Sequence, residues 1–278
     1  FVQTAAINPD AQGVAFKDEV MGRLIRFVSS HEVGHTLGLP HNMGSSVAYP
    51  VDSLRSASFT KKYGTAPSIM DYARFNYIAQ PGDEGVALMP DIGVYDKYAI
   101  EWGYRPILDR SAEEEKKTLD SWILKHAGDP MYRFGHQQVG DVVDPSSQTE
   151  DLGDDAVKAS TYGIANLKRI VPKLVEWTKE DGKNYDDLET LYGQIVSQFN
   201  RYMGHVSNNI GGVYEHHKTY DQEGAVYTHV SKAHQQKCAA FLQNELYKTP
   251  EWLLDQDIFS RTQYSGFVER IRSMQVRT

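Results

Sequence analysis

Three histidines and one glutamate stand in residues 31–41, which read HEVGHTLGLPH. On a helix, residues four apart lie on one face with about 6 Å of rise between them, so His31 and His35 can point at one metal ion. Gly38 lets the backbone turn sharply out of the helix, and His41 can then swing back as a third nitrogen ligand. Three imidazole ligands leave one tetrahedral position for water, which is typical of a catalytic zinc site.

Glu32 is the candidate proton carrier of this pattern. It projects about 100° around the helix from His31, so it can flank the ion without ligating it. Zinc lowers the pKa of a bound water to about 7, and an adjacent carboxylate can take the proton of that water and pass it to the leaving amine. The full pattern, H-E-x-x-H-x-x-G-x-x-H, arises by chance in on the order of one such chain in ten thousand, which disfavours unrelated histidines.

Residues 68–72 read SIMDY and add a second feature downstream of the histidines. A methionine in a loop is by itself most simply a core residue, because Met fills gaps. Together, however, the two segments resemble the metzincin clan of metalloproteases. The resemblance implies that Met70 forms a hydrophobic floor beneath the zinc site. It also places Tyr72 where astacins and serralysins carry a tyrosine that can bind zinc or hydrogen-bond the oxyanion; a structural tyrosine is the alternative. Asp71 is a candidate acceptor for a ligand histidine.

Longer stretches narrow this resemblance. The chain is similar to the met-zincin domain of large bacterial zinc-dependent metalloproteases in four segments: RFVSSHEVGHTLGLPHN (26–42), SIMDYARFNYIAQPGD (68–83), DIGVYDKYAIEWGYRP (91–106) and DLGDDAVKASTYGIANLKRIVP (151–172). In such proteins a signal peptide and sizeable upstream domains precede the catalytic region. The resemblance therefore implies an exported bacterial protein, in the periplasm, at the outer membrane or outside the cell.

The upper rim of the metzincin cleft is a mostly parallel sheet that precedes the zinc helix and binds substrate by strand addition. Only 30 residues precede His31, and the chain starts with Phe1 instead of Met. We therefore expect a fragment that carries the lower half of the active site and a helical extension. Upstream domains of the same polypeptide would complete the cleft for a peptide or protein substrate.

Helical periodicity predicts a mainly α fold. Apolar residues from Phe16 to about Leu37 recur with helical spacing, and Gly38 and Pro40 end this helix just before His41. Irregular chain is expected over 42–90 and 128–155. Further helices are expected at about 92–102, 111–126, 162–178 with Pro172 as a kink or break, 188–206, 230–247, 250–256 and 265–274.

These elements suggest three regions along the chain. Residues 1–108 form the metzincin catalytic region with the zinc helix, the Met-turn and the helix that follows. Residues 109–150 are a connecting segment, and residues 151–278 form a helical C-terminal region. The N-terminal sheet of the metzincin fold is expected to be missing.

The composition excludes several other classes of protein. With 29 Lys and Arg against 37 Asp and Glu, the formal charge is 29 − 37 = −8, which argues against a nucleic-acid-binding protein. No run approaches the roughly 18 apolar residues of a membrane span. Cys238 is the only cysteine, so an internal disulfide framework is excluded.

Two alternative functions compete with that of a zinc endopeptidase. A gluzincin takes its third ligand from a downstream glutamate, but no E-x-x-x-D pairing lies between Asn42 and Glu101. A non-catalytic zinc-containing module could instead use the helical region as a binding or scaffolding surface. Such a module has no chemical need to keep Glu32, so the sequence favours the peptidase.

Overall fold

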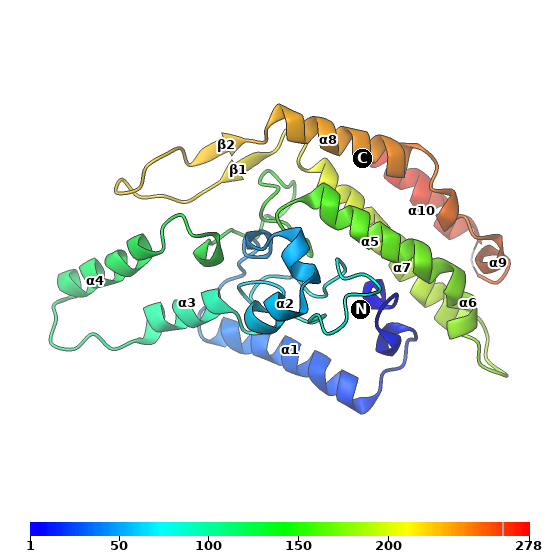
Figure 1. Cartoon of the computed structure of the whole chain (residues 1–278), viewed down its shortest axis with the longest axis horizontal. Coiled ribbons are helices and arrows are strands. Elements are labelled where there is room, and N and C mark those ends of the chain that lie inside the picture. The colour runs from blue at the N-terminus through cyan, green and yellow to red at the C-terminus, as the bar shows by residue number, and fades with distance from the viewer. Residues whose placement is uncertain (263) are drawn as a thin grey trace.

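The computed structural model describes residues 1–262 and 264–278 and is mainly α-helical, which confirms the predicted fold class (Figure 1). The α-helices are α1 (Asp18–Thr36), α2 (Ala57–Tyr63), α3 (Val94–Tyr104), α4 (Ala112–Lys125), α5 (Ala156–Ile170), α6 (Leu174–Trp177), α7 (Asp186–Ser207), α8 (Lys232–Leu242), α9 (Gln256–Phe259) and α10 (Tyr264–Arg277). The 3-10 turns are η1 (Val2–Thr4), η2 (Pro9–Ala11), η3 (Ser46–Ala48), η4 (Val51–Arg55), η5 (Pro130–Tyr132), η6 (Val171–Lys173) and η8 (Glu251–Leu253), and η7 (Gln243–Tyr247) is a π-helical turn.

The ends of several helices differ from those predicted, for local reasons. Helix α5 begins at Ala156 instead of 162, because the side chain of Asp155 caps it by accepting a hydrogen bond from the Lys158 backbone N–H. Pro172 breaks the predicted helix into α5, η6 and α6, as the sequence indicated. The stretch predicted to be irregular contains the short helix α2, whose N-cap is Ser56.

A β-hairpin interrupts the C-terminal region, which the sequence pattern predicted to be helical almost throughout. Strands β1 (Val213–Glu215) and β2 (Tyr227–His229) pair antiparallel, with Tyr214 opposite Thr228. Three-residue strands are too short for an alternating pattern to stand out, so this prediction was wrong there.

Helices α5 and α7 form the centre of the packing, and α8 and α10 lie along one edge of the molecule while α1 lies along the opposite edge (Figure 1). The largest buried side chains of α5 and α7 include Leu167 and Phe199. One hydrophobic cluster joins these helices to the loop that follows Met70, among others through Tyr77. Asn166 of α5 also donates hydrogen bonds to the carbonyls of Tyr77 and Ala79, at 3.0 and 2.8 Å. Helix α5 therefore supports the loop that follows Met70.

Helix α1 is unusually exposed for a long helix. Only Val20, His31 and Gly34 are buried along its length. Within the described residues, no helix is both long enough and apolar enough to cross a membrane.

Candidate metal centre

The three histidines of the motif converge at the end of α1. His31 is buried, His35 and His41 are partly exposed, and one nitrogen of each lies within 4.8 Å of the others. Gly38 has a φ of +85°, so the backbone takes the left-handed turn that carries His41 back toward the helix. In the described part of the chain, no other group of three histidine, cysteine or carboxylate side chains is arranged to hold a metal ion.

The hydrogen bonds of the rings identify which nitrogens face the centre. Nδ1 of His31 donates to the Ile69 carbonyl at 2.7 Å, and Nδ1 of His35 donates to the Leu39 carbonyl at 2.9 Å. Nδ1 of His41 donates to Oε1 of Gln137 at 2.7 Å. Because each Nδ1 carries its hydrogen toward an oxygen, each Nε2 is left with a lone pair.

These Nε2 atoms lie very close together, at 3.2 Å between His41 and His31 and 3.1 Å between His35 and His41. Lone pairs at such distances repel unless a cation lies between them, so the donor set fits a metal ion. Burial lowers the pKa of His31, and the nearby His35 and His41 act in the same direction against the Ile69 carbonyl. The neutral ring that results is the form that ligates metal.

Met70 packs against the part of α1 that carries His31 and His35. It is fully buried, and a Cβ added to Gly34 would lie 2.3 Å from its Sδ and 3.2 Å from its Cε. Gly34 is therefore the residue that lets the methionine reach the helix backbone between the two helical histidines. The Met70 carbonyl in turn accepts the backbone N–H of Asn42 at 3.1 Å, which joins this turn to the chain carrying His41.

Asp96 of α3 fixes the turn that contains Met70. Its carboxylate accepts hydrogen bonds from Ser68 Oγ at 2.6 Å, from the Ile69 N–H at 2.8 Å and from the Gly93 N–H at 2.7 Å. Burial raises the pKa of Asp96, and these three hydrogen bonds act in the opposite direction. Asp96 of α3 thus helps to fix the position of Ile69, whose carbonyl accepts the hydrogen bond from Nδ1 of His31.

Glu32 and Tyr72 both lie at this centre. Glu32 is exposed, makes no hydrogen bond or ion pair in the described part of the chain, and contributes a Coulombic interaction to the pKa of His31. The Tyr72 ring stacks on His31 with centroids 5.3 Å apart and lies 4.5 Å from the His41 ring. The guanidinium group of Arg74 lies over the Tyr72 ring, with its Cζ 5.4 Å from the ring centroid. The catalytic roles of Glu32 and Tyr72 stay predictions.

Asp71 accepts no hydrogen bond from His31, His35 or His41, so its interpretation as an acceptor for one of these histidines was wrong. Its Oδ2 accepts hydrogen bonds from Ser45 Oγ at 3.1 Å and from the Ser46 N–H at 2.8 Å. Ser46 Oγ also donates to Asp151 at 3.3 Å, which brings two buried carboxyl groups together. Burial raises the pKa of Asp151 to about 7 and raises that of Asp71 well above its usual range.

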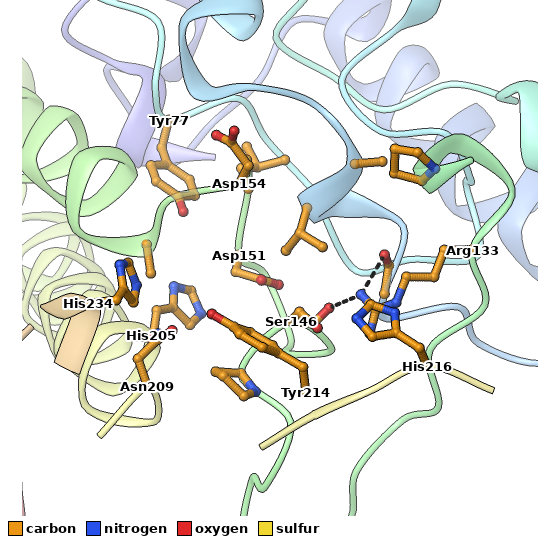
Figure 2. Close-up of a pocket in the computed structure, with 18 residues that line it drawn as sticks. Tyr77, Arg133, Ser146, Asp151, Asp154, His205, Asn209, Tyr214, His216 and His234 are labelled. Carbon is orange, nitrogen blue, oxygen red and sulfur yellow. Dashed lines mark hydrogen bonds between the residues drawn. The ribbon is translucent and has the colours of Figure 1, made fainter. Parts of the chain in front are cut away.

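A cavity of about 260 Å³ lies beside Asp151 and is lined in part by residues of α7, β1 and α8 (Figure 2). Figure 2 shows Asp151, His205 and Tyr214 around it. Nε2 of His205 donates to the Thr149 carbonyl at 2.9 Å, and burial lowers the pKa of His205 to about 4. The His205 ring is therefore neutral at pH 7.

No signal in the sequence pointed to the contact of Gln137 with His41. Gln137 stands 96 residues beyond His41, in a stretch expected to be only a connection. A lone glutamine in an irregular segment carries no spacing or periodicity that could have indicated this contact.

Comparison with known proteins gives one positive result. A family model described as Met-zincin matches residues 13–278 of the chain. Searches of curated proteins and of solved structures found no significant match.

Proposed function

The chain belongs to the Met-zincin family, and from this premise we propose that it is a zinc-dependent metalloendopeptidase that hydrolyses peptide bonds. The convergence of three Nε2 lone pairs at the end of α1 is the observation that carries the proposal. His31, His35 and His41 would hold the zinc. When bound, zinc polarises the scissile carbonyl and lowers the pKa of a coordinated water to about 7.

Glu32 acts as the general base and then as the general acid. Its position next to His31, together with its exposure and its lack of a competing partner in the described residues, leaves the carboxylate available to water. It would take a proton from the attacking water and deliver it to the amine of the leaving peptide. Groups in this role typically contribute about 10²–10⁴-fold to the rate.

Tyr72 and Met70 complete the proposed site. Tyr72 packs its ring against His31 and His41, and its hydroxyl makes no hydrogen bond in the described part of the chain. The hydroxyl is therefore free to donate to the oxyanion that develops during attack. Met70 supports the helix from below and keeps its backbone in place.

We further propose that upstream domains of the same polypeptide cover α1 and complete the substrate cleft. Met21, Ile25 and Val28 form an apolar stripe on this helix, with 41%, 58% and 51% of their surfaces exposed. Glu32 follows Val28 by four residues, so the stripe and the proposed general base lie on one face of the helix. An exposed apolar stripe that leads to the proposed catalytic site is a suitable surface for packing of the sheet that forms the upper rim of the cleft. Export of the protein is proposed from the family resemblance.

Hydrolysis of a peptide library by the zinc-loaded protein with its native upstream segments tests this function. New amino and carboxyl termini, detected by mass spectrometry, are expected from the wild type. Glu32→Gln is expected to bind zinc and to produce none. Zinc binding without cleavage by the wild type would favour a non-catalytic zinc module, and equal cleavage by both proteins would remove Glu32 from the mechanism.

A further inference from the structure

We propose that Gln137 is a positioning residue of the metal centre, which holds the His41 ring in the orientation and tautomer that a metal ion requires. The observation is the 2.7 Å hydrogen bond from Nδ1 of His41 to Oε1 of Gln137. The inference rests on the proposed role of His41 as a zinc ligand. Metal-binding histidines commonly donate their second nitrogen to such an acceptor, which fixes the ring and raises its basicity.

His41 depends on an external acceptor more than the other two histidines do. His31 and His35 lie on α1, where the helix backbone fixes their direction, and both donate to backbone carbonyls. His41 lies beyond the helix, after the left-handed turn at Gly38, and its side chain is partly exposed. Its orienting partner is a side chain, so this ligand can be perturbed without altering the backbone.

The chain around Gln137 is joined directly to the residue after His41. Asn42 is fully buried, and its side-chain amide donates to the Arg133 carbonyl at 2.9 Å while its Oδ1 accepts the Gly135 N–H at 2.9 Å. The segment of residues 133–137 therefore lies beside His41 and cannot shift without breaking two hydrogen bonds to the buried Asn42. Gly44 allows this approach, since a Cβ on it would lie 2.9 Å from Gly135 Cα.

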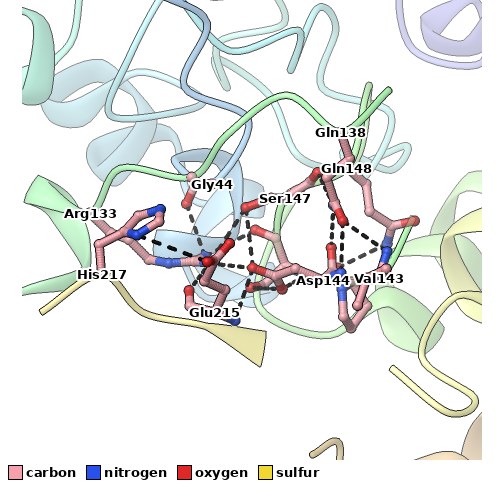
Figure 3. Close-up of polar contacts among 12 residues, drawn as sticks. Gly44, Arg133, Gln138, Val143, Asp144, Ser147, Gln148, Glu215 and His217 are labelled. Carbon is pink, nitrogen blue, oxygen red and sulfur yellow. Dashed lines mark hydrogen bonds and ion pairs between the residues drawn. The ribbon is translucent and has the colours of Figure 1, made fainter. Parts of the chain in front are cut away.

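Arg133 holds the start of this segment (Figure 3). Its guanidinium donates to Asp144 at 2.9 Å, to the Ser146 carbonyl at 3.0 Å and to the Glu215 carbonyl of β1 at 3.1 Å. The side chains of Arg133 and Asp144 are only 12% and 8% exposed, so the ion pair is shielded from solvent. Removing one partner would leave the other charge buried and unpaired.

Gln138 holds the segment immediately after Gln137 (Figure 3). Its Oε1 accepts the backbone N–H groups of Val143 and Asp144, both at 2.8 Å. Its Nε2 donates to the carbonyls of Asp144 and Ser147 at 2.8 and 2.9 Å. Gln137 is thus fixed on both sides while its own side chain is directed to His41. The stretch expected to be a connection contributes a functional part of the metal centre.

The test measures the zinc dissociation constant by competition with a chromophoric chelator. Gln137→Leu removes the acceptor and keeps the size of the side chain, and it is expected to weaken zinc binding by about 10–100-fold. Gln137→Glu restores an acceptor for Nδ1–H and is expected to bind zinc at least as tightly as the wild type. Gln236→Leu is the matched control, because Gln236 is exposed on α8 and makes no side-chain hydrogen bond in the described part of the chain.

A spectroscopic readout separates positioning from a general structural role. In metal-free protein, long-range ¹H–¹⁵N correlations are expected to show His41 with its hydrogen on Nδ1 in the wild type and in Gln137→Glu. In Gln137→Leu the ring is expected to populate both neutral tautomers. The thermal midpoints of the metal-free variants should match the wild type, because Gln137 is exposed.

Wild-type zinc affinity and an unchanged His41 tautomer in Gln137→Leu would overturn the inference, as would a Gln137→Glu variant that binds zinc as weakly as Gln137→Leu. His41→Ala separates this failure from failure of the proposed function. If His41→Ala weakens zinc binding and Gln137→Leu does not, only the role of Gln137 is wrong. If His41→Ala binds zinc like the wild type, the ligand assignment itself is wrong.

Discussion

Substitution of Gly34 by alanine probes the contact between α1 and Met70. The new Cβ would lie 2.3 Å from Met70 Sδ, more than 1 Å closer than an ordinary van der Waals contact. Met70 is fully buried, so its side chain has little room to withdraw. Gly22 lies on the same helix with nothing within 4 Å of its added Cβ, and Gly22→Ala is therefore the matched control.

The difference between the two variants isolates the steric cost. Both gain about 1 kcal/mol of helix propensity from the replacement of glycine by alanine. Only Gly34→Ala adds a methyl group to a filled site, which costs about 1–3 kcal/mol. We therefore expect Gly22→Ala to be stabilised and Gly34→Ala to be less stable than that control by about 1–3 kcal/mol. At about 2–4 °C per kcal/mol, their thermal midpoints should differ by roughly 2–12 °C.

A double substitution tests whether Met70 is the cause. Met70→Ala alone is expected to cost about 2–5 kcal/mol, because it leaves a cavity. Combined with Gly34→Ala, the total loss should be smaller than the sum of the two single losses by about 0.5–3 kcal/mol. Equal stability of Gly34→Ala and Gly22→Ala in chemical denaturation, or strictly additive losses in the double variant, would refute the reasoning.

Three further predictions concern single side chains. Glu32→Gln in the complete protein should lose at least about 10²-fold in kcat with zinc content near one per chain; activity above a few per cent would contradict the general-base role. Tyr72→Phe should lower kcat and kcat/KM by the same factor, at least about tenfold, and an unchanged kcat would make the residue structural. Because burial raises the pKa of Asp151 to about 7, its contribution to stability is present below about pH 4 and lost as the pH rises through about 7. The free energy of unfolding of Asp151→Asn, measured by urea denaturation, should therefore fall less than that of the wild type between about pH 4 and pH 7. An equal fall in both proteins would contradict the assignment.

Local spacing predicted the convergence of His31, His35 and His41. The four-residue interval between His31 and His35 required a helix, and Gly38 adopts the left-handed conformation that the return of His41 needs. These features depend on residues within one or two helical turns, so periodicity and backbone preference are sufficient to find them.

Contacts between distant segments were not predictable in the same way. Nothing in the spacing of the chain relates Gln137 to His41 or Asp96 to the Ile69 N–H, since each pair meets only when separate elements pack. The hairpin of β1 and β2 was missed because its strands are too short to show alternation.

The division into three regions stays a prediction. One hydrophobic cluster extends from Val2 through Tyr77 to Ile271, so the N-terminal turns and the loop after Met70 share buried contacts with the helices of the C-terminal region. Glu150 adds to this link, because it pairs with Arg74 at 2.9 Å and with Arg201 of α7 at 2.6 Å. Helix packing that joins sequence regions in this way is invisible in composition alone.

X-ray absorption at the zinc edge of the zinc-loaded protein tests the central claim most directly. The expected spectrum has three imidazole nitrogens at about 2.0–2.1 Å and one further oxygen donor. His41→Ala should lose one of the three imidazole contributions and retain the other two. A spectrum without three imidazoles, or one that His41→Ala leaves unchanged, would contradict the claim that His31, His35 and His41 form the metal centre.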